Sequence, residues 1–255
     1  MSSSLTIPES STKQMSHKIS VAQSDLEWVN TVVQEIIFQA TQAIRARGFH
    51  TLVLSGGHTP QPIFQELASP TYQTQLDWKK IYIFWGDERC VPPTDQDSNF
   101  FMAKTALLDR IAIPPNNVFR IRGEIQPEEA ANVYQQDIDQ FFIGREKRFD
   151  TILLGLGEDG HTASLFPNTN GLRESTRWVV PNMNPYSNTH RVTLTFPAIN
   201  NSRNIIFLVN GANKAKVVAD IIRNPNSPPQ YPAKQITGKE TQPHWILDSA
   251  AAKKI

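Results

Sequence analysis

The stretch Thr151-Ile152-Leu153-Leu154-Gly155-Leu156-Gly157-Glu158-Asp159-Gly160-His161 decides the fold of this chain. Its continuous apolar run predicts a strand buried on both faces, which is typical of a mostly parallel sheet covered by helices. A second glycine turn, Ser55-Gly56-Gly57-His58-Thr59-Pro60, follows another apolar run. Backbone N–H groups after such strands can hold a phosphate, and an imidazole can move protons. The two turns together predict chemistry on a phosphorylated small molecule.

Strand-like and helical segments alternate on both sides of these turns. Apolar residues spaced three and four apart predict a helix over Asp25–Arg47, with Gly48 as its C-terminal cap. The other expected helices cover 60–68, 99–108, 127–142 and 213–222, and the expected strands cover 50–54, 80–85, 118–121, 149–154, 177–180, 191–195 and 204–209. This alternation predicts an α/β fold, a three-layer α/β/α sandwich with a Rossmann-like, mostly parallel sheet.

Composition excludes several classes of function. Lys and Arg number 25 against 24 Asp and Glu, so the formal charge of +1 is too balanced for a nucleic-acid surface. No run of apolar residues is long enough to predict a membrane span. Cys90 is the only cysteine, which excludes an intramolecular disulfide and fits a reducing, cytoplasmic location.

The chain shows no internal repeat and no break in composition, so we expect one domain over residues 17–255 that acts as a monomer or homodimer. Residues 1–16 are rich in Ser and Thr and lack a signal sequence, which predicts a disordered leader. The Pro-rich segment 224–232 is short enough to be a surface loop.

The first glycine turn has the features of an anion-binding site. Gly56 and Gly57 permit close approach of the backbone, Thr59 can cap the following helix, and Pro60 suits the first helical position. The alternative is a tight strand-to-helix turn that binds nothing.

The second turn matches the sequence motif GxGxxG, so a dinucleotide-binding site has to be considered. That site needs an acidic residue at the end of the next strand, which here ends in Pro181-Asn182. We therefore favour an acid–base pair, in which neutral His161 accepts a proton and Asp159 stabilises the imidazolium. The alternative is that Asp159 only caps a helix.

Two cations follow expected strands. Arg89 could clamp a phosphate, with Asp87 or Glu88 holding it or contacting sugar hydroxyls. Lys214 stands at another strand-to-helix junction. For residues 87–89 the alternative is an ion-paired surface turn, and for Lys214 it is a lysine that contacts only solvent. The histidines show no metal-ligand spacing, so we expect no metal site.

Several motifs closely resemble the 6-phosphogluconolactonase family: the first glycine turn, Gly86-Asp87-Glu88-Arg89 with Asp97-Ser98-Asn99, the segment 155–167, Arg191-Val192-Thr193-Leu194-Thr195, Gly211-Ala212-Asn213-Lys214-Ala215 and Trp245-Ile246-Leu247-Asp248. The resemblance covers the chain after residue 17. It implies the fold shared with glucosamine-6-phosphate deaminases and ribose-5-phosphate isomerases. It also implies hydrolysis of 6-phospho-D-glucono-1,5-lactone in the pentose phosphate pathway, without metal or organic cofactor.

Carried onto this sequence, the resemblance implies that His161 activates water with the support of Asp159. It implies a ligand shell of Gly56, Gly57, Thr59, Asp87, Arg89, Arg191 and Lys214 around a sugar-phosphate lactone.

Two other functions stay open. The first is an amino-sugar phosphate deaminase or isomerase, but the segment 163–169 has no carboxylate to supply the extra acid–base step. The second is a non-catalytic sugar-phosphate sensor, but residues 1–16 are too short and polar for a helix-turn-helix.

Overall fold

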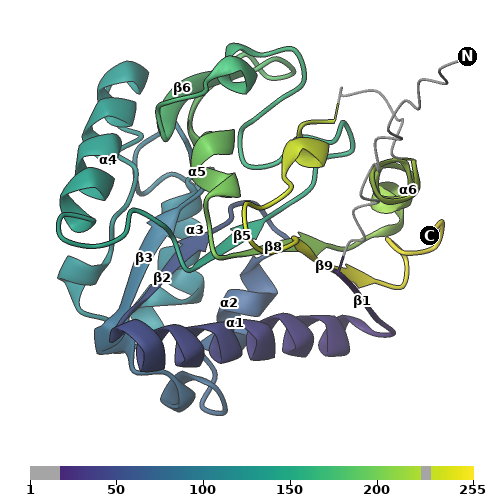
Figure 1. The fold of residues 1–255 in the computed structure, drawn as a ribbon, viewed down its shortest axis with the longest axis horizontal. Coiled ribbons are helices and arrows are strands. Elements are labelled where there is room, and N and C mark those ends of the chain that lie inside the picture. Colours follow the sequence, from purple (N-terminus) through teal and green to yellow (C-terminus); the bar gives the residue numbers. More distant parts are fainter. Residues whose placement is uncertain (1–17, 225–230) are drawn as a thin grey trace, which may run out of the picture.

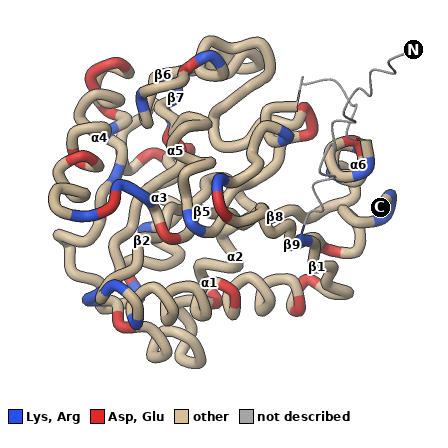
Figure 2. The backbone as a smooth tube through the Cα atoms, in the orientation of Figure 1, with Lys and Arg blue, Asp and Glu red and all other residues tan. Residues whose placement is uncertain are grey.

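The computed structural model describes residues 18–224 and 231–255. The predicted leader 1–16 and most of the predicted loop 224–232 lie outside the described residues. Within those residues, no helix has both the length and the apolar character needed to cross a membrane. Figure 2 shows positive and negative residues interspersed along the backbone, in line with the near-zero formal charge.

The centre of the molecule is a six-stranded sheet in which every pairing is parallel. Its order is β1-β9-β8-β5-β2-β3. The strands are β1 (Lys18–Ala22), β2 (His50–Leu54), β3 (Ile81–Trp85), β5 (Thr151–Leu154), β8 (Asn204–Val209) and β9 (His244–Asp248). The chain passes outward from β2 to β3 and then places β5 on the other side of β2. The carboxyl ends of β2 and β5 therefore flank a topological switch point, where open α/β sheets bind ligands.

Helices cover both faces of this sheet. They are α1 (Asp25–Arg47), α2 (Gln61–Leu67), α3 (Asn99–Ala106), α4 (Pro127–Phe141), α5 (Phe196–Asn200) and α6 (Ala215–Arg223). Figure 1 shows α1 and α2 below the sheet and α4, α5 and α6 above it. The three-layer α/β/α architecture predicted from the sequence is confirmed.

Helix α1 has the predicted bounds because both of its ends are capped. The side chain of Ser24 accepts a hydrogen bond from the Glu27 N–H at the start of the helix. Gly48 ends it with φ of 82°, a left-handed conformation that favours glycine, and its N–H donates to the Ile44 carbonyl.

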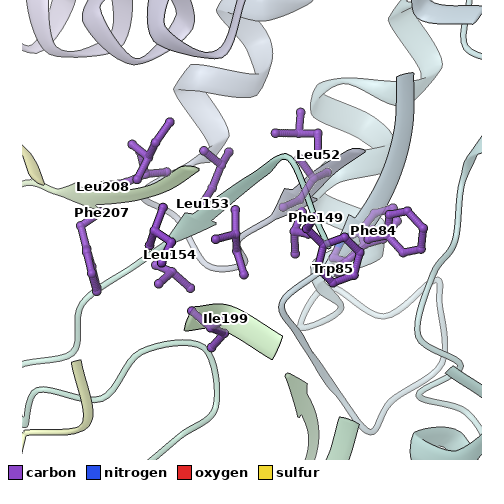
Figure 3. Close-up of a cluster of buried hydrophobic side chains, with 14 of the residues drawn as sticks. Leu52, Phe84, Trp85, Phe149, Leu153, Leu154, Ile199, Phe207 and Leu208 are labelled. Atoms are coloured by element: carbon purple, nitrogen blue, oxygen red, sulfur yellow. The ribbon is translucent and has the colours of Figure 1, made fainter. Parts of the chain in front are cut away.

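The hydrophobic core lies on both faces of the central strands (Figure 3). Successive residues of a strand point to opposite faces, so Leu208 meets the layer of α1 while Phe207 points to the other layer. Ile199 of α5 packs on that second layer, and Phe207 also stacks on Trp245 with ring centroids 4.0 Å apart. Continuous apolar strands are therefore buried on both sides, as predicted.

A second, three-stranded antiparallel sheet lies apart from the first, in the order β4-β7-β6. Its strands are β4 (Asp87–Arg89), β6 (Val179–Asn184) and β7 (Thr189–Leu194). The strands expected at 177–180 and 191–195 do form, but in this sheet, where they pair with each other and β7 also pairs with β4. Residues 87–89 are thus a strand and not the surface turn that a charged triplet suggests.

Two other expectations need correction. Residues 118–121 form no strand, because only Val118 bridges to β3 before a turn closed by the Gly123 N–H and the Ile121 carbonyl ends the segment. Strands β1 and β9 were not predicted; β1 is a short edge strand whose residues are mostly exposed and show no apolar run, and β9 was noted only as a motif at 245–248.

Candidate active site

The turns that follow β2, β3, β5 and β8 meet at one edge of the parallel sheet and enclose a cavity of about 340 Å³. Cavities of this size hold small ligands. Eight of the nine predicted site residues line it: Gly56, Gly57, Thr59, Asp87, Arg89, His161, Arg191 and Lys214. The ninth, Asp159, lies behind His161 and contacts it directly.

His161 and Asp159 form a hydrogen-bonded pair at the wall of the cavity. The Nδ1 atom of His161 lies 2.5 Å from Oδ1 of Asp159, which also accepts from the His161 backbone N–H at 3.1 Å. Burial opposes ionisation of Asp159, but the hydrogen bonds from His161 outweigh it and lower its pKa to about 2. The carboxylate is therefore ionised at neutral pH and holds the proton of the imidazole on Nδ1. This leaves the lone pair of Nε2 available as a base.

The loop around the pair is tightly closed. The Gly157 N–H donates to the His161 carbonyl at 2.8 Å, and the Gly160 N–H donates to the Gly157 carbonyl at 3.0 Å. A Cβ atom on residue 157 would lie 2.0 Å from Nδ1 of His161, so only glycine fits there. Gly160 has φ of 76°, and a Cβ on it would meet the ring of Tyr231 at 2.4 Å. The packing of the loop thus explains why glycine is needed at these two positions without a bound dinucleotide.

The turn after β2 also depends on close packing. A Cβ on residue 56 would lie 2.0 Å from Oδ1 of Asn99, because the glycine packs directly on this buried amide. Thr59 does not cap α2 as expected. Pro60 occupies the N-cap position, and the Thr59 hydroxyl donates to Oδ1 of Asn210 at 3.2 Å. The hydroxyl thereby ties the turn after β2 to the turn after β8.

Arg89 and Arg191 face each other as register partners on β4 and β7. Burial and the nearby Arg89 charge both lower the pKa of Arg191. The guanidinium of Arg89 donates to the Asp97 carbonyl at 2.5 Å. Lys214 also lines the cavity, so three cationic side chains make its interior strongly attractive to an anion.

The two acids next to Arg89 do not hold its guanidinium, although that was one expectation. Glu88 is only 2% exposed and accepts from the backbone N–H groups of Asn99 and Phe100 at the start of α3. Burial raises the pKa of Glu88 in spite of these bonds. Asp87 accepts from the Ser164 hydroxyl at 2.6 Å. Asp87 therefore fastens the histidine loop to the small sheet.

Several side chains at the site received no role from the sequence, and three of them are polar groups that border the predicted residues. Ser164 and Asn99 line the cavity, and Oδ1 of Asn99 has no hydrogen-bond partner within residues 18–224 and 231–255. The third is Tyr186, whose hydroxyl donates to Oδ2 of Asp159 at 2.8 Å. Asn99 and Ser164 fall inside quoted motifs, but Tyr186 lies in a turn that carries no motif.

The arrangement combines an imidazole paired with a carboxylate and three cations that line one cavity at the switch point of a parallel sheet. Across residues 18–224 and 231–255, no three His, Cys, Asp or Glu side chains are grouped as metal ligands. A site of this kind can bind a phosphorylated sugar and transfer a proton beside it. The fold and site therefore define the class of α/β proteins that act on sugar phosphates.

Comparison with known proteins narrows this class. The sequence model described as glucosamine-6-phosphate isomerases/6-phosphogluconolactonase matches residues 23–245, and the chain belongs to this family. A curated 6-phosphogluconolactonase from Synechocystis sp. is 40% identical over 219 residues, which cover 84% of this chain and 88% of the relative.

Solved structures agree in fold. A 6-phosphogluconolactonase from Thermotoga maritima superposes with a TM-score of 0.79 at 29% identity, covering 91% of this chain and 99% of the other. A monomeric glucosamine-6-phosphate deaminase gives the same TM-score of 0.79 at 21% identity over 93% of this chain and 100% of the other, which shows a common fold only. The predicted family and enzyme class, 6-phosphogluconolactonase, are confirmed.

Proposed function

We propose that this chain hydrolyses 6-phospho-D-glucono-1,5-lactone to 6-phospho-D-gluconate, the second step of the oxidative pentose phosphate pathway in the cytoplasm, with His161 as the general base. The observation that carries the proposal is the short contact between Asp159 and Nδ1 of His161, at the wall of a cavity that also contains three cations. The relatives named above supply the substrate.

The reaction needs a base, a positioned water and little else. Nε2 of His161 takes a proton from the water, whose oxygen attacks the lactone carbonyl carbon to give a tetrahedral oxyanion. When this intermediate collapses, the bond from that carbon to the ring oxygen breaks. The imidazolium returns its proton to the departing ring oxygen. Asp159 stabilises the imidazolium while it exists.

The phosphate lies remote from the reacting carbon and contributes binding energy that orients it. Arg89, Arg191 and Lys214 are the residues we assign to it, because all three cations line the cavity. We assign the backbone of Gly56 and Gly57, with Thr59 and Asp87, to the remaining contacts with the sugar phosphate.

The test of the function follows the disappearance of freshly generated lactone above its spontaneous hydrolysis, with glucosamine 6-phosphate as a parallel substrate. Acceleration of lactone loss alone is the expected result. Ammonia release from the amino sugar would instead indicate a deaminase. Tight binding of a sugar phosphate without turnover would indicate a sensor.

Removing the Arg89 guanidinium should weaken substrate binding by about 1.5–3 kcal/mol, the range for hydrogen bonds to charged groups. We expect Arg89→Ala to raise KM for the phosphorylated lactone and to leave turnover of glucono-1,5-lactone, which lacks the phosphate, unchanged. Steady-state kinetics on both lactones measure this. The matched control is Arg177→Ala, because Arg177 is an exposed arginine paired with Glu128 and Glu174. Equal losses on both lactones would contradict a role in phosphate binding.

A further inference from the structure

The tip of the hairpin between β6 and β7 holds a tyrosine against the acid–base pair. Oδ1 of Asn184 accepts from the Tyr186 N–H at 2.9 Å, and the Asn188 N–H donates to the Asn184 carbonyl at 2.9 Å. Asn188 has φ of 53°, a left-handed conformation that asparagine tolerates better than most residues. The tip therefore has a defined turn geometry, which fixes where the Tyr186 side chain begins.

The ring of Tyr186 belongs to an aromatic row that ends at the imidazole. Its centroid lies 6.4 Å from that of Phe166 in an edge-on arrangement, and Phe166 lies 4.6 Å from His161. Tyr186 is 69% exposed, so the ring is not part of the core. A large aromatic side chain at an exposed turn gains little from burial, and its hydroxyl supplies the specific contact with Asp159.

The carboxylate of Asp159 is shared between two donors on separate oxygens. Oδ1 accepts from His161, and Oδ2 accepts from the Tyr186 hydroxyl at 2.8 Å. The hydrogen bond to Asp159 raises the pKa of Tyr186, so the phenol keeps its proton and stays a donor. A second donor draws negative charge away from Oδ1, and the carboxylate then attracts the imidazolium less strongly.

We propose that Tyr186 is a positioning residue that sets the proton affinity of His161 through Asp159. When the Tyr186 hydroxyl is in place, His161 loses its proton at a lower pH. It is then neutral, and able to accept a proton from water, over a wider pH range. The catalytic part of this inference rests on the proposed function. The electrostatic part concerns only the three side chains and does not need a substrate.

Among the described residues, no charged side chain other than His161 makes a hydrogen bond to Asp159. Glu158 is exposed and accepts from the Asn213 amide at 2.7 Å. The titratable and charged groups that share the cavity with His161 are His58, Asp87, Arg89, Arg191 and Lys214. Asp159 has direct hydrogen bonds to only two of the described side chains, His161 and Tyr186.

The test is Tyr186→Phe, which removes one hydroxyl and keeps the ring. NMR titration of isotope-labelled imidazoles, with the His161 signal assigned by its loss in His161→Ala, measures the midpoint directly. Without the second donor Asp159 holds the imidazolium more tightly, so the midpoint should rise by about 0.3–1 pH unit. The acid limb of kcat/KM should move to higher pH by the same amount, with kcat on the alkaline plateau reduced less than about threefold.

Tyr72→Phe is the matched control, since the hydroxyl of Tyr72 donates to Asn30 at 3.3 Å and Tyr72 does not line the cavity. Its His161 midpoint should equal that of the wild type. An unchanged or lowered midpoint in Tyr186→Phe would overturn the inference, even with full lactonase activity. A raised midpoint in a protein that does not hydrolyse the lactone would support the electrostatic coupling and refute the proposed function.

Discussion

Replacing His161 with alanine should lower kcat for lactone hydrolysis by roughly 10²–10⁴-fold and leave KM within a few fold, because general-base catalysis contributes about that much. The imidazole lines the cavity, but we assign the phosphate contacts to other residues. Lactone disappearance, corrected for spontaneous hydrolysis, measures kcat, and titration with 6-phosphogluconate measures binding independently.

The matched control for this variant is His190→Ala. His190 lies on β7 next to Arg191, but its side chain is exposed and does not line the cavity. Its removal should leave kcat and KM unchanged. If His161→Ala turned over at the wild-type rate, His161 would have no part in the chemistry, although the family assignment would stand.

Gly157→Ala should lower kcat by roughly 10²-fold, because displacing a catalytic group by an ångström can cost that much. The added methyl group would lie 2.0 Å from Nδ1 of His161 and 2.5 Å from Oδ1 of Asp159, so the pair must separate or move. The φ of Gly157 is not in the left-handed region, so the effect is steric. Steady-state kinetics together with chemical denaturation would separate the catalytic loss from a loss of stability.

Gly155→Ala provides the comparison within the same loop. A Cβ on residue 155 would meet only the Ser55 hydroxyl at 3.6 Å, an ordinary contact distance. We expect its kcat to fall less than about threefold, since this contact requires no displacement. Similar losses in both glycine variants would mean that the loop tolerates no substitution at all, and the specific steric explanation would be wrong.

The sequence was sufficient for the parts of the site that follow parallel strands. The turns after β2 and β5 could be placed together because the carboxyl ends of parallel strands share one edge of the sheet. Helix α1 could be given its full extent because a regular apolar pattern ends at Gly48, the C-terminal cap. For the two turns and for this helix, the residues that determine the structure lie next to one another in the sequence.

The sequence did not predict the contacts between segments that are far apart in the chain. Pairing of β4 with β7 sets Arg89 opposite Arg191, and nothing in either segment indicates that register. The contact between Tyr186 and Asp159 likewise depends on where a hairpin tip comes to rest. Glu88 was expected to hold Arg89, to contact the sugar or to belong to an ion-paired surface turn, but it is buried against the first backbone N–H groups of α3.

The facing arginines also have a consequence for the stability of the protein. Like charges directly opposite each other on antiparallel strands are destabilising, and here the partners are Arg89 and Arg191. An anion bound between the two guanidinium groups, as proposed for the phosphate, would offset that repulsion, and ligand binding would then be thermodynamically linked to folding. The small sheet would then be most stable when the cavity is occupied. We therefore expect the proposed sugar-phosphate ligand to protect the protein from unfolding, observed as a rise in its melting temperature with ligand concentration.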